Sequence, residues 1–91
     1  MLQTVSITIK GKVQGVYYRQ STKHRALELS VTGMVGNMPD GSVQVLATGT
    51  PEQLENLVHW CRQGPPRAIV TSVEVKELPL KLFEHFTIQH F

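Results

Sequence analysis

The sequence predicts an α+β fold, a ferredoxin-like open α/β sandwich in which two helices cover one face of a mainly antiparallel sheet. Three observations predict it. Several segments alternate apolar and polar residues with the period of a strand, two segments have helical spacing, and their order is βαββαβ with a short C-terminal strand. A length of 91 residues allows one compact core, so residues 1–91 are expected to form a single domain.

The first strand and the first helix meet at a glycine-containing loop. Val5, Ile7 and Ile9 alternate with polar residues, which predicts a strand with one buried face that ends at Gly11. From residue 18 onward the apolar positions recur at near-helical spacing, which predicts a helix over Tyr18–Leu29. Tyr18 falls on the apolar stripe of this helix and is expected in the core.

A hairpin follows the first helix. Residues Thr32–Asn37 have the pattern of a strand, and Asn37–Gly41 contains a Pro-Asp-Gly turn sequence. Proline fixes φ at the second turn position, and Asp-Gly supplies a local side-chain hydrogen bond and a permissive dihedral. Val43, Val45 and Ala47 are the expected inward residues of the returning strand.

The second helix has the clearest boundaries in the sequence. Residues Thr50–Gln53 combine an N-cap threonine, a proline at the first helical position and a glutamine at the third, as in a capping box. Gly64 and the two prolines after it stop the helix. Its apolar stripe comprises Leu54, Leu57, Val58 and Cys61.

Two further strands complete the fold. Residues 69–76 alternate through Ile69, Thr71, Val73 and Val75, and Phe86 with Ile88 marks a last short strand that ends near Phe91.

Composition excludes several function classes. The chain has 41% hydrophobic and 18% charged residues and a net charge of +2, whereas nucleic-acid binding usually needs a concentrated basic face. One cysteine excludes an intramolecular disulfide. The N-terminus lacks a basic segment followed by an apolar run, and no stretch is long enough to span a membrane. We therefore expect a cytoplasmic monomer without nucleic-acid or membrane partners.

The loop Gly11–Arg19 is the segment that indicates chemistry. Backbone N–H groups at a helix start lack intrahelical partners, and the helix dipole adds positive potential, so this position suits an anion. Gly15 permits the curl that brings successive amides together, and the Arg19 guanidinium matches two phosphate oxygens. The alternative is a simple strand-to-helix turn with a solvated arginine. The loop matches neither a Walker nor a dinucleotide-binding fingerprint.

Gly11–Arg19 reads Gly-x-Val-Gln-Gly-Val-x-Tyr-Arg and closely resembles the first signature of the acylphosphatase family. Gly33–Asn37, followed by Asp40–Val43 and Gly49, is similar to the second signature. Cys61–Pro66 and the closing Phe-Thr-Ile are also similar to members, so the resemblance spans nearly the whole chain.

The resemblance implies hydrolysis of the carboxyl-phosphate anhydride of a small-molecule acyl phosphate, without a metal or other cofactor. It implies that Arg19 and the loop amides hold the phosphate, and that Asn37 orients the attacking water. The amides are those of Gln14, Gly15, Val16, Tyr17, Tyr18 and Arg19.

Three positions depart from the family pattern. Met34 replaces a usual aromatic residue and Gly36 a usual basic one, so the strand beside the site is less basic and more flexible than is typical. Ser30 stands where glycine is common at the end of the first helix, and a left-handed conformation there would cost about 1 kcal/mol.

Other interpretations stay open at this point. Asn37 could be an ordinary turn residue, and the fold could belong to a silent domain that only binds phosphorylated small molecules. RNA-recognition domains share the element order but need exposed aromatic residues on the central strands. Here the first and third strands are expected to expose Ser6, Thr8, Ser42 and Gln44 instead. His24, His59, His85 and His90 are too scattered for a metal site.

Overall fold

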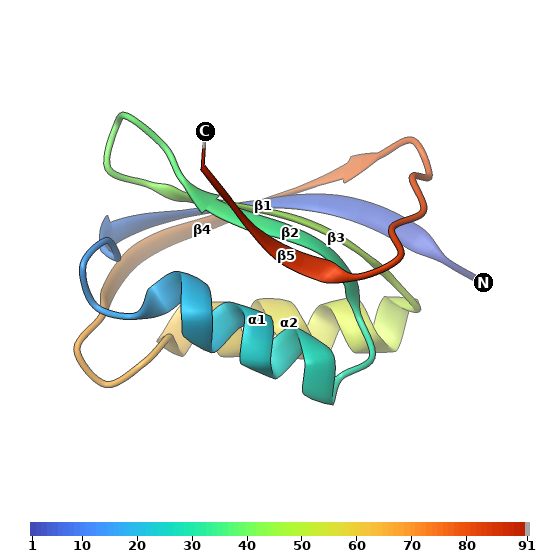
Figure 1. Cartoon of the computed structure of the whole chain (residues 1–91), viewed down its shortest axis with the longest axis horizontal. Coiled ribbons are helices and arrows are strands. Elements are labelled where there is room, and N and C mark those ends of the chain that lie inside the picture. Colours follow the sequence, from blue (N-terminus) through green and yellow to red (C-terminus); the bar gives the residue numbers. More distant parts are fainter. Residues whose placement is uncertain (91) are drawn as a thin grey trace.

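The computed structural model describes residues 1–90, and for His90 only the backbone. These residues form two helices and five strands in the predicted order. They are β1 (Gln3–Lys12), α1 (Tyr18–Glu28), β2 (Thr32–Asn37), β3 (Val43–Gly49), α2 (Pro51–Gln63), β4 (Ile69–Leu78) and β5 (Phe86–His90). Both helices lie against the same face of one sheet (Figure 1). None of the helices within the described chain combines the length and the apolar character that crossing a membrane requires.

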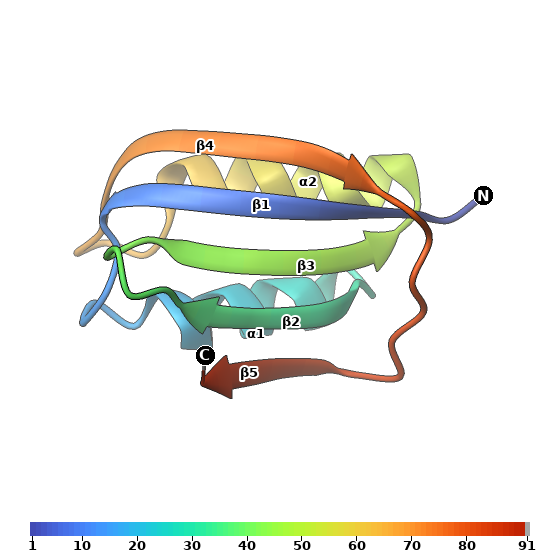
Figure 2. The same ribbon diagram turned by 90° about the horizontal axis from the view of Figure 1, so that it is seen from above.

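The described strands form one sheet in the order β4-β1-β3-β2-β5 (Figure 2). Three of the pairings are antiparallel, and only β5 runs parallel to its neighbour β2. This arrangement confirms the predicted sandwich with a mainly antiparallel sheet. The parallel edge strand places residue 90 opposite Asn37, at the end of the sheet where the hairpin turns.

The core lies between the sheet and the helices. The alternating residues of β1 and β3 are buried as predicted, and Val43, Val45 and Ala47 are fully inaccessible to solvent. On the apolar stripe of α2, Leu54, Leu57 and Cys61 are buried, and Val58 is partly covered. Each fully buried aliphatic side chain contributes roughly 1.5–3 kcal/mol to folding, so this layer supplies the main stabilising term.

The alternating apolar residues of β4 are not all buried on one face of the sheet. Ile69 and Val75 are exposed, whereas Val70 and Val73 pack partly against the core. A register shift between Lys10 and Gly11 of β1 changes the pairing with β4, so residues on either side of the bulge face opposite ways. The strand also lies at the sheet edge, where the helices cover less of its inner face.

The prediction that four polar residues are exposed on the open face of the sheet is wrong for two of them. Ser6 and Ser42 are buried, with 9% and 4% of their surface accessible, and Thr8 and Gln44 are half-buried. Ser6 is small and lies between larger side chains of both flanking strands. Ser42 lies in the turn before β3, where the Gln14 side chain reaches its carbonyl and its own hydroxyl donates to Asp40.

The ends of the helices follow from local sequence. Thr50 and Gln53 form the predicted capping box: the Thr50 hydroxyl accepts from the Gln53 amide at 3.2 Å, and Gln53 Oε1 accepts from the Thr50 amide at 2.9 Å. At the end of α1, Ser30 has φ 60°, the left-handed conformation that usually favours glycine. Its amide donates to the Leu27 carbonyl, and the next amide donates to Ala26, which makes a Schellman motif.

Candidate active site

The loop between β1 and α1 adopts an unusual backbone. Gly15 has φ 75° and Tyr17 has φ 66°, so a tyrosine occupies the left-handed region at a cost of about 1–2 kcal/mol. Left-handed residues alternating with ordinary ones turn successive N–H groups toward one side and form a concave anion site, called a nest. Such strain persists where the surrounding structure enforces it, and it is frequent at functional sites.

The N-terminus of α1 is open. Tyr17 is its N-cap, no side chain of the described residues caps it, and its first turn contains no acidic residue. The first amides of the helix therefore lack internal partners, and the positive end of the helix dipole is uncompensated. An anion placed here would satisfy both.

One cavity of about 560 Å³ adjoins this loop, and both Arg19 and Asn37 line it. The two residues are 18 positions apart in the chain and come from different layers, a helix start and a strand end. Folding therefore brings together the pair that the sequence singled out. The cavity is lined by Val13, Gly15, Tyr17, Tyr18, Arg19, Gln20, Asn37, Arg67 and Ile88.

Arg19 is half-buried beside the cavity, and no carboxylate of the described residues pairs with it. The ion pairs in that part of the chain join other residues, such as Lys10 with Glu74 at 3.9 Å. An unpaired guanidinium next to open helix amides gives the cavity a positive potential, which favours an anion.

Asn37 has a side-chain oxygen that is buried without a hydrogen-bond partner among the described residues. Among the side chains that the structure describes, those of residues 1–89, it is the only buried nitrogen or oxygen in this condition. Leaving such a group unsatisfied costs about 1–3 kcal/mol. An ordinary turn residue would bond to its own backbone. The oxygen is therefore free to receive a hydrogen bond from a bound water or ligand.

Gln14 and Val16 do not line the cavity, although the resemblance included their amides in the phosphate loop. The Gln14 side chain donates to the carbonyls of Met38 and Ser42, both at 2.9 Å. Val16 is buried in the core with 5% of its surface accessible. The two side chains thus tie the loop to the hairpin and to the core, and this fixes Arg19 relative to Asn37.

The hairpin beside Asn37 is itself held by local bonds. The Asp40 carboxylate accepts from the amide of Ser42 at 2.9 Å and from its hydroxyl at 2.6 Å. The hydrogen bonds from the Ser42 hydroxyl and amide lower the pKa of Asp40, so the turn keeps its charged acceptor further into the acid range than an ordinary aspartate would. The Met38 amide donates back to Ser42, which closes the turn.

Tyr18 anchors the start of α1 on α2, as its position on the helical stripe predicted. Only 1% of its surface is accessible, its hydroxyl donates to the Cys61 carbonyl at 2.7 Å, and its ring lies 5.6 Å from that of Trp60. Burial raises the pKa of the Tyr18 phenol, and it raises the pKa of the Cys61 thiol to about 12. Cys61 is therefore a neutral core residue rather than a nucleophile.

Of the lining residues that were not predicted as site residues, Arg67 is the charged one. It is exposed and comes from the loop that joins α2 to β4. The loop reaches the site because β4 pairs with β1 so that residues 69 and 70 lie opposite Lys12 and Gly11. The only feature of the sequence near Arg67 that could have indicated a role is its position directly after the prolines that stop α2. In the described part of the chain, no three His, Cys, Asp or Glu side chains gather as a metal site would need.

Comparison with known proteins identifies the family. The family model "Acylphosphatase" matches residues 5–88. The acylphosphatase of Marinobacter nauticus is 53% identical over 73 residues, which covers 80% of this chain and 79% of that protein. Solved acylphosphatases from Coxiella burnetii and Bacillus subtilis superpose with TM-scores of 0.94 and 0.93 at 34% and 33% identity. The alignments cover 97% of this chain and 93% of the Coxiella chain, and 98% and 99% for Bacillus. The chain belongs to the acylphosphatase family and is a hydrolase of acyl phosphates.

Proposed function

We propose that this hydrolase works by holding the phosphate of an acyl phosphate in the loop of residues 14–19 and directing a water at its phosphorus. The amides of the loop and the start of α1 bind the phosphate oxygens, and the Arg19 guanidinium neutralises them. Phosphoryl transfer is accelerated chiefly by positioning and by stabilising charge on the equatorial oxygens. The open helix start and the unpaired arginine support both roles.

Asn37 orients the attacking water. The observation that carries this role is its buried side-chain oxygen, which has no partner among the described residues and faces a cavity that Arg19 also lines. A water that donates a hydrogen bond to this oxygen is fixed beside the bound phosphate with a lone pair free for attack. The opposite side of the phosphorus is then left for the departing carboxylate.

The proton of the water goes to a phosphate oxygen of the substrate. No aspartate, glutamate or histidine side chain of the described residues lines the cavity, and a neutral amide cannot accept a proton at ordinary pH. The carboxylate leaving group is weakly basic and needs little protonation. A bell-shaped rate profile that followed an enzyme carboxylate or imidazole would contradict this route.

The partner of the protein is a small acyl phosphate, and we propose that the chain acts as a cytoplasmic monomer without nucleic-acid or membrane partners. We also propose that no metal or cofactor takes part. Phosphate release measured with excess chelator tests the metal claim directly: unchanged turnover supports it, and loss of turnover that added Mg²⁺ restores refutes it.

Replacing Asn37 tests the central proposal. Asn37→Ala should lower kcat on benzoyl phosphate by on the order of 10²-fold, because it removes the group that positions the water. The matched control is Asn56→Ala on the exposed face of α2, which should leave kcat unchanged. Circular dichroism should show both variants folded. If Asn37→Ala turned over at the wild-type rate, the water-positioning role would be wrong.

A further inference from the structure

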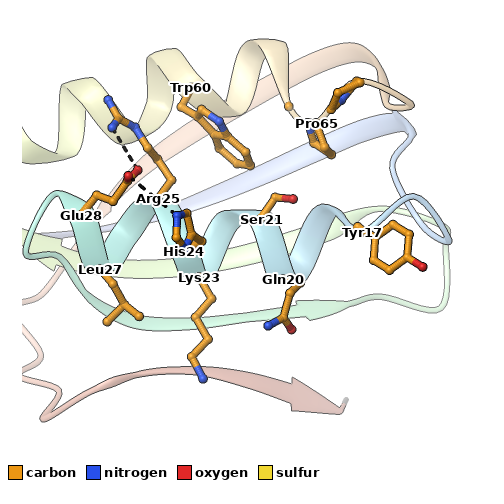
Figure 3. A pocket seen from close by; sticks show the side chains of 12 residues that line it. Tyr17, Gln20, Ser21, Lys23, His24, Arg25, Leu27, Glu28, Trp60 and Pro65 are labelled. Atoms are coloured by element: carbon orange, nitrogen blue, oxygen red, sulfur yellow. Dashed lines mark hydrogen bonds and ion pairs between the residues drawn. The ribbon is translucent and has the colours of Figure 1, made fainter.

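A second cavity, of about 610 Å³, lies between α1 and α2 and adjoins the phosphate site. Tyr17 and Gln20 line both cavities, so the two share a wall. Two consecutive residues also connect the cavities, because Pro66 lines the second cavity and Arg67 lines the phosphate site. Figure 3 shows Trp60 from α2 and Ser21 from α1 pointing into the space between the helices, with Tyr17 at one end.

Aromatic residues and prolines gather toward the end of this groove nearest the phosphate site, with the polar Gln20 and Ser21 among them. Tyr17, Trp60 and the prolines at positions 65 and 66 line it. Tyr17 has 77% of its surface exposed although its backbone is strained, so its ring is presented rather than buried. Trp60 is held by its contact with the Tyr18 ring at 5.6 Å. Such a wall gains free energy by covering an apolar group.

The far end of the groove is charged. The Arg25 guanidinium lies 3.3 Å from the Glu28 carboxylate, and His24 Nε2 lies 3.7 Å from the same group. Figure 3 shows this cluster at the end opposite Tyr17. This cluster limits the apolar part of the groove to the side nearer Tyr17, which suits a compact acyl group better than a long chain that would reach the charges.

The geometry of in-line attack directs the leaving group toward the same groove. In an in-line displacement the leaving group departs on the side opposite the attacking water. Asn37 lies in the sheet layer and does not line the groove, whereas the groove lies in the helix layer. A water held by Asn37 would therefore attack from the sheet side, and the acyl group would point toward Tyr17.

We propose that the groove between the helices binds the acyl group of the substrate, so that the enzyme prefers acyl phosphates with a compact apolar or aromatic acyl group over acetyl phosphate. This inference rests on the proposed catalytic function, since it places the acyl group by the side from which water attacks. It adds a specificity site formed by Tyr17, Ser21, Trp60 and the two prolines.

Filling the groove tests the inference. Ser21→Phe places a ring where the acyl group would lie, and the half-buried Ser21 leaves space on its cavity side. The ratio of kcat/KM on benzoyl phosphate to kcat/KM on acetyl phosphate should fall by about 10-fold, the discrimination typical of one blocked apolar contact. Ser72→Phe, on the exposed edge strand β4, is the matched control and should leave the ratio unchanged.

Tyr17→Gly provides a second measurement that does not depend on the folding of the Phe variant. Glycine accepts φ 66° without strain and deletes the ring, so the same ratio should fall. If both variants kept the wild-type ratio, the groove would not bind the acyl group. That outcome leaves the proposed function standing, because hydrolysis of both substrates continues; absence of hydrolysis by the wild-type protein would refute the proposed function instead.

Discussion

The two helices of this protein begin in opposite ways. At the start of α2, Thr50 and Gln53 satisfy the free amides through a capping box, and Glu52 in the first turn complements the dipole. At the start of α1, Tyr17 is left-handed, no side chain of the described residues caps the helix, and acidic residues are absent from the first turn. The closed end stabilises the fold, and the open end leaves its amides and its positive potential for a ligand.

The open end needs stabilisation from elsewhere. A missing cap costs about 1 kcal/mol, and the left-handed tyrosine adds a similar amount. Packing offsets both, because Tyr18, Thr22 and Ala26 are buried against the sheet and α2. The Thr22 hydroxyl also donates to the Tyr18 carbonyl at 2.7 Å. Helix α1 is therefore held by its buried face, which includes Tyr18 in the first turn, and not by a cap.

The largest effect is expected when the Arg19 guanidinium at the start of α1 is replaced by a group of another shape. Arg19→Lys keeps the charge but removes the planar fork that matches two phosphate oxygens, so kcat/KM on benzoyl phosphate should fall by on the order of 10²-fold. Arg62→Lys on the exposed side of α2 is the control and should retain wild-type kinetics. Full activity in Arg19→Lys would mean that a point charge is enough at this helix start.

Inorganic phosphate should stabilise the protein through the open end of α1 alone. A ligand at 100 times its Kd adds about 2.7 kcal/mol to the free energy of unfolding, which thermal melts with increasing phosphate detect as a rise in Tm. Equal concentrations of chloride control for ionic strength. The rise should shrink in Arg19→Lys and persist in Thr50→Ala, because the Glu52 carboxylate in the first turn of α2 repels an anion there even when the cap is removed. A rise of the same size in Arg19→Lys would place the phosphate elsewhere.

The contrast between the two helix starts also explains what could be predicted from the sequence. The capping box of α2 and the burial of Val43, Val45 and Ala47 follow from local spacing, and the structure confirms them. The fold class follows from the order of such elements. The pairing of Arg19 with Asn37 in one cavity was expected only through the resemblance to a family, because no local rule relates a helix start to a distant strand end.

Other features depend on register, which the sequence does not reveal. The bulge at Gly11 decides which residues of β4 face the core, and it brings Arg67 to the site. A Cβ at Gly11 would collide with the backbone carbonyl of Ile69, so the glycine reflects this close approach as well as the loop that follows. Likewise, Ser6 and Ser42 were expected on an exposed face but are buried, Ser6 between the side chains of the flanking strands and Ser42 in the turn that the Gln14 side chain reaches.

Removing the cap of the closed helix should affect stability without affecting catalysis. Thr50→Ala deletes the hydroxyl that accepts from the Gln53 amide and should lower the free energy of unfolding by about 1 kcal/mol. Urea unfolding measures this change, and kcat on benzoyl phosphate should remain at the wild-type value. Thr71→Ala on the exposed edge of β4 serves as the control with a smaller loss. A fall in kcat for Thr50→Ala would contradict the division of roles between the two helix starts.

The smallest expected effect distinguishes strain that serves the site from strain that does not. Tyr17 and Ser30 are the non-glycine residues with positive φ in the described chain, and they lie at opposite ends of α1. Ser30→Gly should raise the free energy of unfolding by about 0.5–1 kcal/mol, because glycine adopts the left-handed C-terminal conformation without strain. Ser72→Gly in β4 should lower it, since glycine weakens a strand. Catalysis should not change in either variant. If Ser30→Gly altered kcat, the far end of α1 would contribute to the geometry of the phosphate loop, and the strain there would be functional too.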